Sequence, residues 1–193
     1  FYSVQRTCHV PLPTLRLAWV TAMLWQICVL SGGLSLLAGM NSGKEYAELE
    51  WPFDIAIAIV WISFGVVFFS TIACRRIKPI YISNWFYGGL IIVIAMLHVV
   101  NSLVMPATLL KSYPVYAGAQ DAIVQWWYGH NAVGFLLTGG FLGMLYYFLP
   151  KLADRPIWSY KLSVVAFWSF TYAYIWAGPH HLHYNSIPDW VQN

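Results

Sequence analysis

Long apolar runs alternate with short polar segments along this chain. Five runs are nearly free of charged residues, and each ends at proline, glycine or charged positions. An α-helix rises about 1.5 Å per residue, so about 20 residues cross a hydrocarbon core of about 30 Å. The pattern therefore predicts an all-α, polytopic membrane protein with five transmembrane helices at residues 15–37, 53–73, 85–104, 123–148 and 158–177.

The residues before the first predicted span have a different character. Residues 1–4 are mainly aromatic and apolar, and Pro11 and Pro13 prevent a helix from continuing into the first span. We expect the tail of a preceding helix followed by a short loop. The chain begins at Phe1 without Met, so we expect it to be an internal part of a longer protein.

Composition supports the membrane class. Hydrophobic residues make up 60% of the 193 residues and charged residues only 9%, whereas soluble domains carry about 25% charged residues. The 18% aromatic content suits interfacial belts, and it equally suits walls around a large flat cofactor. No run of basic residues could follow a phosphate backbone, so nucleic acid is not an expected partner.

The basic residues predict an orientation. Cytoplasmic loops are enriched in Lys and Arg, and with alternating spans one side of the membrane receives eight of the ten basic residues. Phe1 is accordingly expected on the cytoplasmic side and Asn193 on the outer, periplasmic side. The eight are Arg6, Arg16, Arg75, Arg76, Lys78, Lys151, Arg155 and Lys161.

Histidines gather where the fifth span ends. His180 and His181 follow a Gly-Pro pair, and His130 lies in the fourth span at a depth that brings it near the same face. Membrane histidines are costly to bury and indicate metal ligation or a proton relay. Three neutral imidazoles suit Cu, Zn or Fe and leave positions open for an exogenous ligand.

Simpler interpretations stand beside this one. His130, His180 and His181 could be neighbours without a metal. His98, alone in the third span, is more often a buried hydrogen-bonded side chain than a ligand, and interfacial exposure or support of a ligand is the favoured interpretation of His183.

Several tracts carry a family resemblance. Residues 126–135, 139–150, 174–184 and 188–190 resemble the catalytic subunit I of the cbb₃-type cytochrome c oxidases, the C-type branch of the haem-copper superfamily. The likeness extends to residues 44–52, 84–86 and 4–7, so it covers essentially the whole chain. The combination of Tyr-Gly-His-Asn with a later Gly-Pro-His-His-Leu-His-Tyr is highly specific.

The resemblance implies a catalytic site. His130, His180 and His181 would ligate copper, and Tyr174 would be a redox-active tyrosine covalently linked to His130. Four-electron reduction of dioxygen needs a nearby donor of an electron and a proton. Tyr174 lies seven residues before His181, which is about two helical turns, so the two share a helix face.

Further roles are implied by the same resemblance. Glu45 matches a position that helps to hold a calcium ion near the haem propionates, and Trp126 matches an indole close to those propionates. Tyr146, Tyr160 and Ser163 match positions of a proton pathway from the cytoplasmic side. One departure is Ala166, where relatives tend to carry histidine.

The resemblance also implies partners and cofactors. Two b-type haems would take their axial histidines from outside this chain, and c-type cytochrome subunits would deliver electrons. The expected setting is the bacterial inner membrane, with membrane lipid around the spans and dioxygen as substrate. The expected activity is reduction of dioxygen to water coupled to proton translocation.

Three functions other than oxygen reduction remain as alternatives. A nitric oxide reductase of the same superfamily recruits an intramembrane glutamate, and no Asp or Glu lies inside the fourth or fifth span. A membrane metal-binding or transport module predicts polar residues distributed through the spans, whereas here they cluster at one depth. A haem-anchoring protein would require His98 and another histidine to bind haem.

Overall fold

The computed structural model describes residues 1–192, so the predicted position of Asn193 lies outside the described residues. The elements follow in this order: α1 (Tyr2–Cys8), α2 (Leu15–Leu37), α3 (Trp51–Ala73), α4 (Ile82–Asn101), β1 (Val104–Thr108), β2 (Lys111–Pro114), α5 (Gly118–Ala132), η1 (Val133–Gly139), α6 (Gly140–Leu152), α7 (Tyr160–Tyr174), η2 (Gly178–Leu182) and α8 (Asp189–Gln192).

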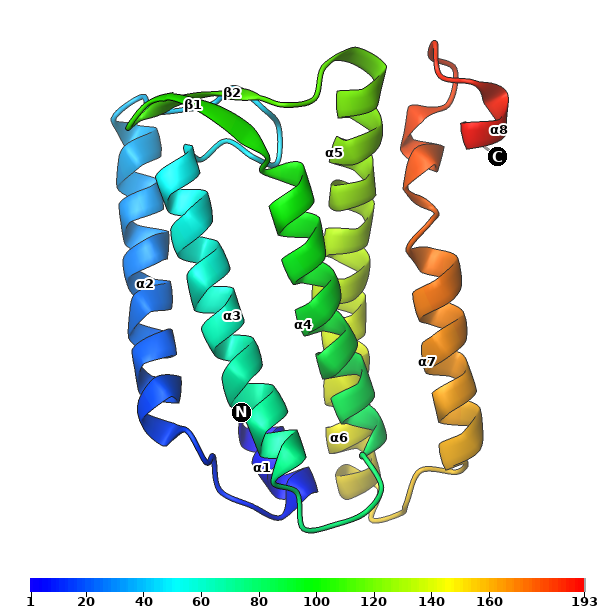
Figure 1. The fold of residues 1–193 in the computed structure, drawn as a ribbon. Coiled ribbons are helices and arrows are strands. Elements are labelled where there is room, and N and C mark those ends of the chain that lie inside the picture. Colours follow the sequence, from blue (N-terminus) through cyan, green and yellow to red (C-terminus); the bar gives the residue numbers. More distant parts are fainter. Residues whose placement is uncertain (193) are drawn as a thin grey trace.

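The long helices stand side by side as a bundle (Figure 1). α4 lies at its centre and packs against α3, α5, α6 and α7, while α2 packs on α3. Apolar side chains are buried near both ends of α4, where Ile82 and Leu97 are fully buried. α4 thus packs on α5, which carries His130, and on α7, which leads to His180 and His181.

The outer faces of the bundle are apolar as well. Leu30 on α2 is 66% exposed and Ile62 on α3 is 63% exposed. Such surfaces are unfavourable in water and suit lipid. Four helical segments are long and apolar enough to cross a membrane: Leu15–Leu37, Trp51–Ala73, Ile82–Asn101 and Gly118–Leu152. The chain is thus a multi-pass membrane protein.

The fifth predicted span differs from the other four. Within residues 158–177, α7 occupies only Tyr160–Tyr174, which is 15 residues, short of the length that spans a bilayer. The chain then passes through Ile175–Ala177 into η2, a 3₁₀-helix. The count of five spans therefore stays a prediction.

Several helix boundaries differ by a few residues from those predicted. α4 ends at Asn101, and the last residue of the predicted span, Val104, begins an antiparallel hairpin in which it pairs with Pro114. This hairpin closes one end of the bundle and is the one departure from an all-helical fold among residues 1–192. Pro150, which follows the predicted fourth span, lies inside the last turn of α6, which runs to Leu152.

The fourth predicted span is one continuous rod of three parts. α5 and α6 are α-helices, and between them the seven residues of η1 form a π-helix. π-helical segments are rare and occur often at functional sites. This one begins three residues after His130.

Charge is separated between the two ends of the bundle. α1 and α6 end at the same end of the bundle, where α2 and α7 begin (Figure 1). The segments at this end carry the eight basic residues that the sequence assigns to one side. We call it the basic end, and the hairpin, η2 and α8 lie at the other.

Candidate metal centre

Three histidines converge between α5 and η2. The ligand nitrogens of His130, His180 and His181 lie within 4.8 Å of one another. His130 Nδ1 is 3.4 Å from His181 Nε2, and the His130 and His180 rings meet edge to face with centroids 4.6 Å apart. The sequence prediction that the fourth span and the fifth segment bring these residues together is confirmed.

The backbone between α7 and η2 is shaped for this approach. A Cβ on Gly178 would lie 2.7 Å from the carbonyl oxygen of Trp126 and 3.1 Å from the Cα of Trp127, so only glycine lets η2 lie against α5. Asn131 Nδ2 donates to the carbonyls of Trp127 (2.7 Å) and Ile175 (3.0 Å). This amide joins α5 to the end of α7.

The 3₁₀-helix η2 also brings the adjacent His180 and His181 to the same site. The His180 and His181 rings lie with centroids 4.3 Å apart and planes 32° apart. On a regular α-helix neighbouring side chains would point about 100° apart. The irregularity expected from the Gly-Pro pair is present, because Gly178 and Pro179 open η2.

Tyr174 completes the cluster from the last residue of α7. Its ring stacks on His130 with centroids 4.3 Å apart and planes 19° apart. A Cβ on Gly134 would overlap the Tyr174 ring, so the phenol occupies space that the π-helical segment leaves open. Phe135, 1% exposed, and Phe170 pack against the same ring.

The imidazoles are available as metal ligands. His130 Nε2 is buried and has no hydrogen-bond partner, which is unfavourable unless a ligand satisfies it. Partial burial lowers the pKa of His181 from its usual range, and the nearby His180 lowers it further. His181 is thus neutral near pH 7, the form that binds metals. This donor set fits a copper ion.

Trp126 lies one turn before His130 and joins the site to the loop before α3. Its indole stacks on the His181 ring with centroids 4.1 Å apart and meets Tyr46 edge to face at 5.7 Å. Glu45, which precedes Tyr46 in that loop, accepts a hydrogen bond from Gln125 Nε2 at 2.8 Å. Within residues 1–192, no converging group of three histidine, cysteine or acidic side chains includes Glu45. The calcium assignment stays a prediction.

The three predicted proton-pathway residues lie nearer the basic end, between α4, α6 and α7. Tyr160 donates to the carbonyl of Ile80 at 2.8 Å, Ser163 donates to the carbonyl of Ser159 at 2.8 Å, and the Tyr146 ring stacks on Phe86. Among the described residues, no hydrogen bond joins the three to one another. Their pathway role stays a prediction.

Sequence reasoning missed Tyr81 at this interface. Its hydroxyl donates to the carbonyl of Tyr146 at 2.9 Å. Burial raises the pKa of Tyr81, so the phenol remains a donor. Its position just before α4, after a basic loop, gave no sign of burial.

The other two histidines named in the sequence analysis lie outside the cluster. His98 Nε2 lies 3.0 Å from the carbonyl oxygen of Asp54, so the interpretation of a buried, hydrogen-bonded histidine is confirmed. His183 is exposed and its ring lies beside Tyr184. Neither belongs to the converging group.

Lys44 is the main polar residue near the site that sequence reasoning missed. Its side chain is 3% exposed, and Nζ donates to the carbonyl of Asn101 at 2.9 Å and lies 2.9 Å from Asp121 Oδ1. The ion pair fastens the loop that carries Glu45 to α4 and α5. A lysine in an acidic loop gives no signal of burial, because the same composition is typical of a solvated segment.

An apolar helical bundle that gathers three histidines and a stacked tyrosine at one end is typical of a membrane protein with a candidate transition-metal site. The family described as "Cytochrome C and Quinol oxidase polypeptide I" matches residues 1–193, and the chain belongs to this family. The family resemblance stated from the sequence is thereby confirmed, and the family implies haem and copper as cofactors.

Three bacterial relatives are similar over the whole or nearly the whole chain. The "Cbb3-type cytochrome c oxidase subunit CcoN1" of Stutzerimonas stutzeri is 59% identical over 193 residues, which are 100% of this chain and 41% of the relative. The "Cytochrome c oxidase subunit 1" of Rhodobacter capsulatus is 53% identical over 99% of this chain and 36% of its own length. The "Cytochrome c oxidase subunit 1 homolog" of Azorhizobium caulinodans is 50% identical over 100% and 35%. The chain thus spans about two fifths of their length or less.

Proposed function

We propose that this chain supplies the copper-binding half of the haem-copper centre in a terminal oxidase. The oxidase reduces dioxygen to water with electrons from c-type cytochrome subunits and couples this reaction to proton translocation. The observation that carries the proposal is the convergence of His130, His180 and His181 within 4.8 Å. The names of the relatives, which are cytochrome c oxidase subunits, support it.

The three histidines would hold the copper. Copper bound by them, facing a haem iron, supplies a site for the binding and reduction of dioxygen. His130 offers a buried nitrogen without a protein partner, and Trp126 holds the His181 ring by stacking. The rings are thus oriented by packing before a metal binds.

Tyr174 would supply an electron and a proton during oxygen reduction, and it is covalently linked to His130 in the mature enzyme. Stacking keeps the phenol beside that imidazole. Apolar packing from Phe135 and Phe170 surrounds the ring and limits access of water. Tyr146, Tyr160 and Ser163 belong to the route that brings protons from the basic end.

The chain would form walls for two b-type haems, whose axial histidines come from elsewhere in the complex. His98 is engaged with the carbonyl of Asp54, and Trp126 would lie near the haem propionates. A calcium ion at Glu45 would lie near the same propionates. The basic end, with Phe1, would face the cytoplasm of a bacterium, and the histidine end would face the periplasm.

The donor set favours the oxidase over a nitric oxide reductase. The converging group of metal-ligand candidates in the described chain consists of three histidines and contains no carboxylate. A reductase centre with non-haem iron would add a glutamate. A transport module is disfavoured because it would need ligand groups distributed along the spans, whereas the converging ligand candidates of the described chain lie together at one end of the bundle.

The test is metal content and copper electron paramagnetic resonance on the intact complex with His180→Ala. His183→Ala is the matched control, because His183 is exposed and outside the cluster. We expect His180→Ala to lose one copper and oxygen consumption while the haem spectra persist, and His183→Ala to keep both. Unchanged copper in His180→Ala, or iron bound in place of copper, would contradict the proposal.

A further inference from the structure

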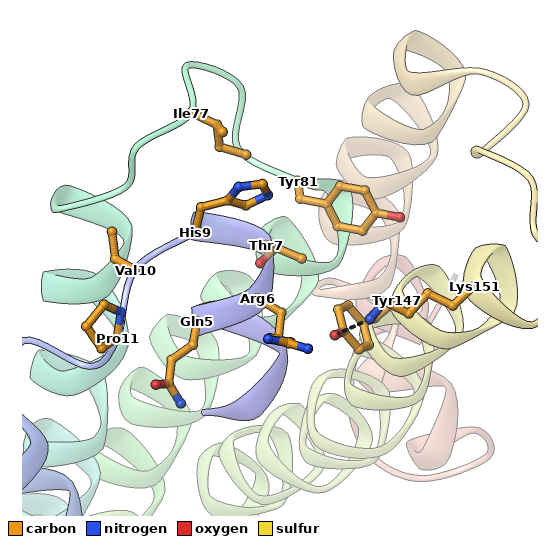
Figure 2. A pocket seen from close by; sticks show the side chains of 10 residues that line it. All are labelled: Gln5, Arg6, Thr7, His9, Val10, Pro11, Ile77, Tyr81, Tyr147 and Lys151. Carbon is orange, nitrogen blue, oxygen red and sulfur yellow. Dashed lines mark hydrogen bonds between the residues drawn. The ribbon is translucent and has the colours of Figure 1, made fainter.

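A polar cavity lies at the basic end of the bundle, whereas the three clustered histidines lie at the other end. Its volume is about 830 Å³, and α1, the loop after it, the segment before α4 and the end of α6 enclose it (Figure 2). Arg6, His9, Tyr81, Tyr147 and Lys151 are among the residues that line it. None of them belongs to the candidate metal centre.

The lining is positively charged without compensation. It contains Arg6, Lys151 and the titratable His9, and it contains no Asp or Glu. The acidic residue next to this cavity in sequence, Asp154, follows α6 but does not line the cavity. Among the salt bridges of residues 1–192, none involves Arg6 or Lys151. Among the described residues, Arg6 and Lys151 therefore have no negatively charged partner.

Within residues 1–192, the fold leaves most hydrogen-bond donors of these two cations without a partner. Basic side chains in the last turn of a helix often pair with its terminal carbonyls, and Arg75 does so with the carbonyl of Ile72 at 3.0 Å. Arg6 makes no hydrogen bond in the described structure and lies over the Tyr2 ring at 5.7 Å. Lys151 Nζ donates only to Tyr147, at 2.9 Å.

Two tyrosine rings lie between the two cations. Arg6 lies over the Tyr2 ring, and Tyr2 meets Tyr147 edge to face with centroids 6.1 Å apart. Figure 2 shows Arg6 on α1 and Lys151 on α6 lining the same cavity. Lys151 also lies over the Tyr147 ring, 4.6 Å from its centroid. Because the Tyr147 oxygen accepts from Lys151, its own hydrogen remains for another acceptor. A guanidinium, an ammonium and a hydroxyl hydrogen therefore face one space from three side chains.

We infer that this cavity binds the phosphate group of an anionic phosphate ester, most directly the headgroup of an acidic phospholipid. Arginine and lysine are the usual donors to phosphate oxygens. The cavity lies at the end of the bundle that the basic residues mark as the inner face, where anionic headgroups attract such side chains. The exposed apolar faces of the helices extend from this end toward the middle of the bundle, where the acyl chains of such a lipid would lie.

Phosphatidylglycerol is the probe for this site. The intact protein, stripped of bound lipid, is placed in phosphatidylcholine nanodiscs that contain a photoactivatable phosphatidylglycerol, and cross-linked peptides are mapped. The variant Arg6→Gln/Lys151→Gln is compared with Arg16→Gln/Lys161→Gln. The second pair removes the same charge from exposed positions at the same end, outside the cavity.

We expect cross-links on α1 and α6 and their loss in the cavity variant. Each charge contributes about fivefold to binding of an anionic lipid, so affinity should fall on the order of thirtyfold in the cavity variant and much less in the control. Equal labelling of the two variants would overturn the inference.

Inorganic phosphate separates the two sources of the ligand. If phosphate binds the parent protein, is lost in Arg6→Gln/Lys151→Gln and displaces no lipid label, the cavity takes a soluble phosphate ester and the phosphate inference holds. If phosphate displaces the lipid label, both sources share the site. Binding of neither probe at α1 and α6 would overturn the inference, provided that the histidine centre of the same preparation retains its copper.

Discussion

His98, whose side chain is 15% exposed, and His130, which is 9% exposed, lie on neighbouring helices of one bundle, and their rings have different partners. His98 Nε2 lies 3.0 Å from the carbonyl oxygen of Asp54. His130 Nε2 has no partner, and its Nδ1 faces a second imidazole at 3.4 Å. The first ring is satisfied by the backbone, whereas the second is left with a nitrogen aimed at other potential ligands.

The difference shows how a membrane protein separates a structural histidine from a metal ligand. A buried polar group costs free energy when it is unpaired. The fold around His130 accepts that cost and surrounds the ring with Tyr174, His180 and His181. The fold around His98 avoids this free-energy cost, because the ring contacts the backbone carbonyl of Asp54. Hydrogen-bond satisfaction, rather than burial, therefore distinguishes the two roles.

The largest expected effect comes from exchanging the histidines one at a time for asparagine. His130→Asn should abolish copper binding and lower oxygen reduction by more than about a hundredfold, because even residues that only support ligands cost up to about that much. His98→Asn should retain copper. Metal analysis and oxygen consumption of the intact complex test this pair. Loss of copper in the His98→Asn variant would contradict the distinction between a structural histidine and a metal ligand.

Gly134 tests the packing of Tyr174 on His130. A Cβ there would overlap the Tyr174 ring, whereas a Cβ on Gly139 would meet its nearest neighbour at an ordinary 3.6 Å. Gly134→Ala should therefore displace the phenol. It should lower turnover by about tenfold to a hundredfold, as ångström-scale misplacement does, with copper retained. Gly139→Ala is the control, and equal turnover of the two variants would contradict the role of Tyr174.

Gly178 tests the approach of η2 to α5. A Cβ there would lie 2.7 Å from a backbone oxygen, while a Cβ on Gly33 in α2 has no neighbour within 4 Å. Gly178→Ala should cost about 1–3 kcal/mol and weaken copper retention during dialysis against a chelator. Gly33→Ala should leave copper unchanged and stabilise α2 by about 0.5–1 kcal/mol. Similar copper loss in both would show that the close approach is unimportant.

The smallest effect is expected from replacing His98, the histidine to which we assign a structural role. His98→Leu removes the contact to the Asp54 carbonyl and should lower the free energy of unfolding by about 1 kcal/mol, with the copper signal unchanged. Val99→Leu, at an exposed position of the same helix, is the control for thermal stability. A larger loss, or a changed copper signal, would mean that His98 contributes to the centre.

The sequence predicted much of the site because the relevant signals are local. The Gly-Pro pair indicates an irregular turn, and His180 and His181 follow it directly, while His130 lies in the preceding span. Hydropathy placed four spanning segments, with boundary errors of a few residues. The proximity of Tyr174 and His130 was implied by the resemblance, as a covalent link that stays a prediction, and their stacking was not predicted.

The features that were missed depend on contacts distant in sequence. Lys44 is buried because Asp121 and the end of α4 surround it, and nothing near Lys44 in sequence indicates this. Glu50 lies in a sequence segment rich in acidic residues, yet it is 1% exposed and accepts a hydrogen bond from Ser112 of the hairpin at 2.6 Å. The π-helical form of η1 left no hydropathy signal, since its residues are as apolar as those of its neighbours.

The π-helical segment gives the α5–α6 rod two rotational phases. An α-helix advances about 100° per residue, so a segment that closes wider turns resets the direction of every side chain after it. His130 faces η2 before the segment, whereas Gly143 faces the Tyr87 ring and Tyr147 faces Tyr2 after it. Deleting one residue within Val133–Gly139 would turn the basic end of the rod away from its neighbours and leave the histidine end in place. One helix can thus be adapted at either end by separate substitutions.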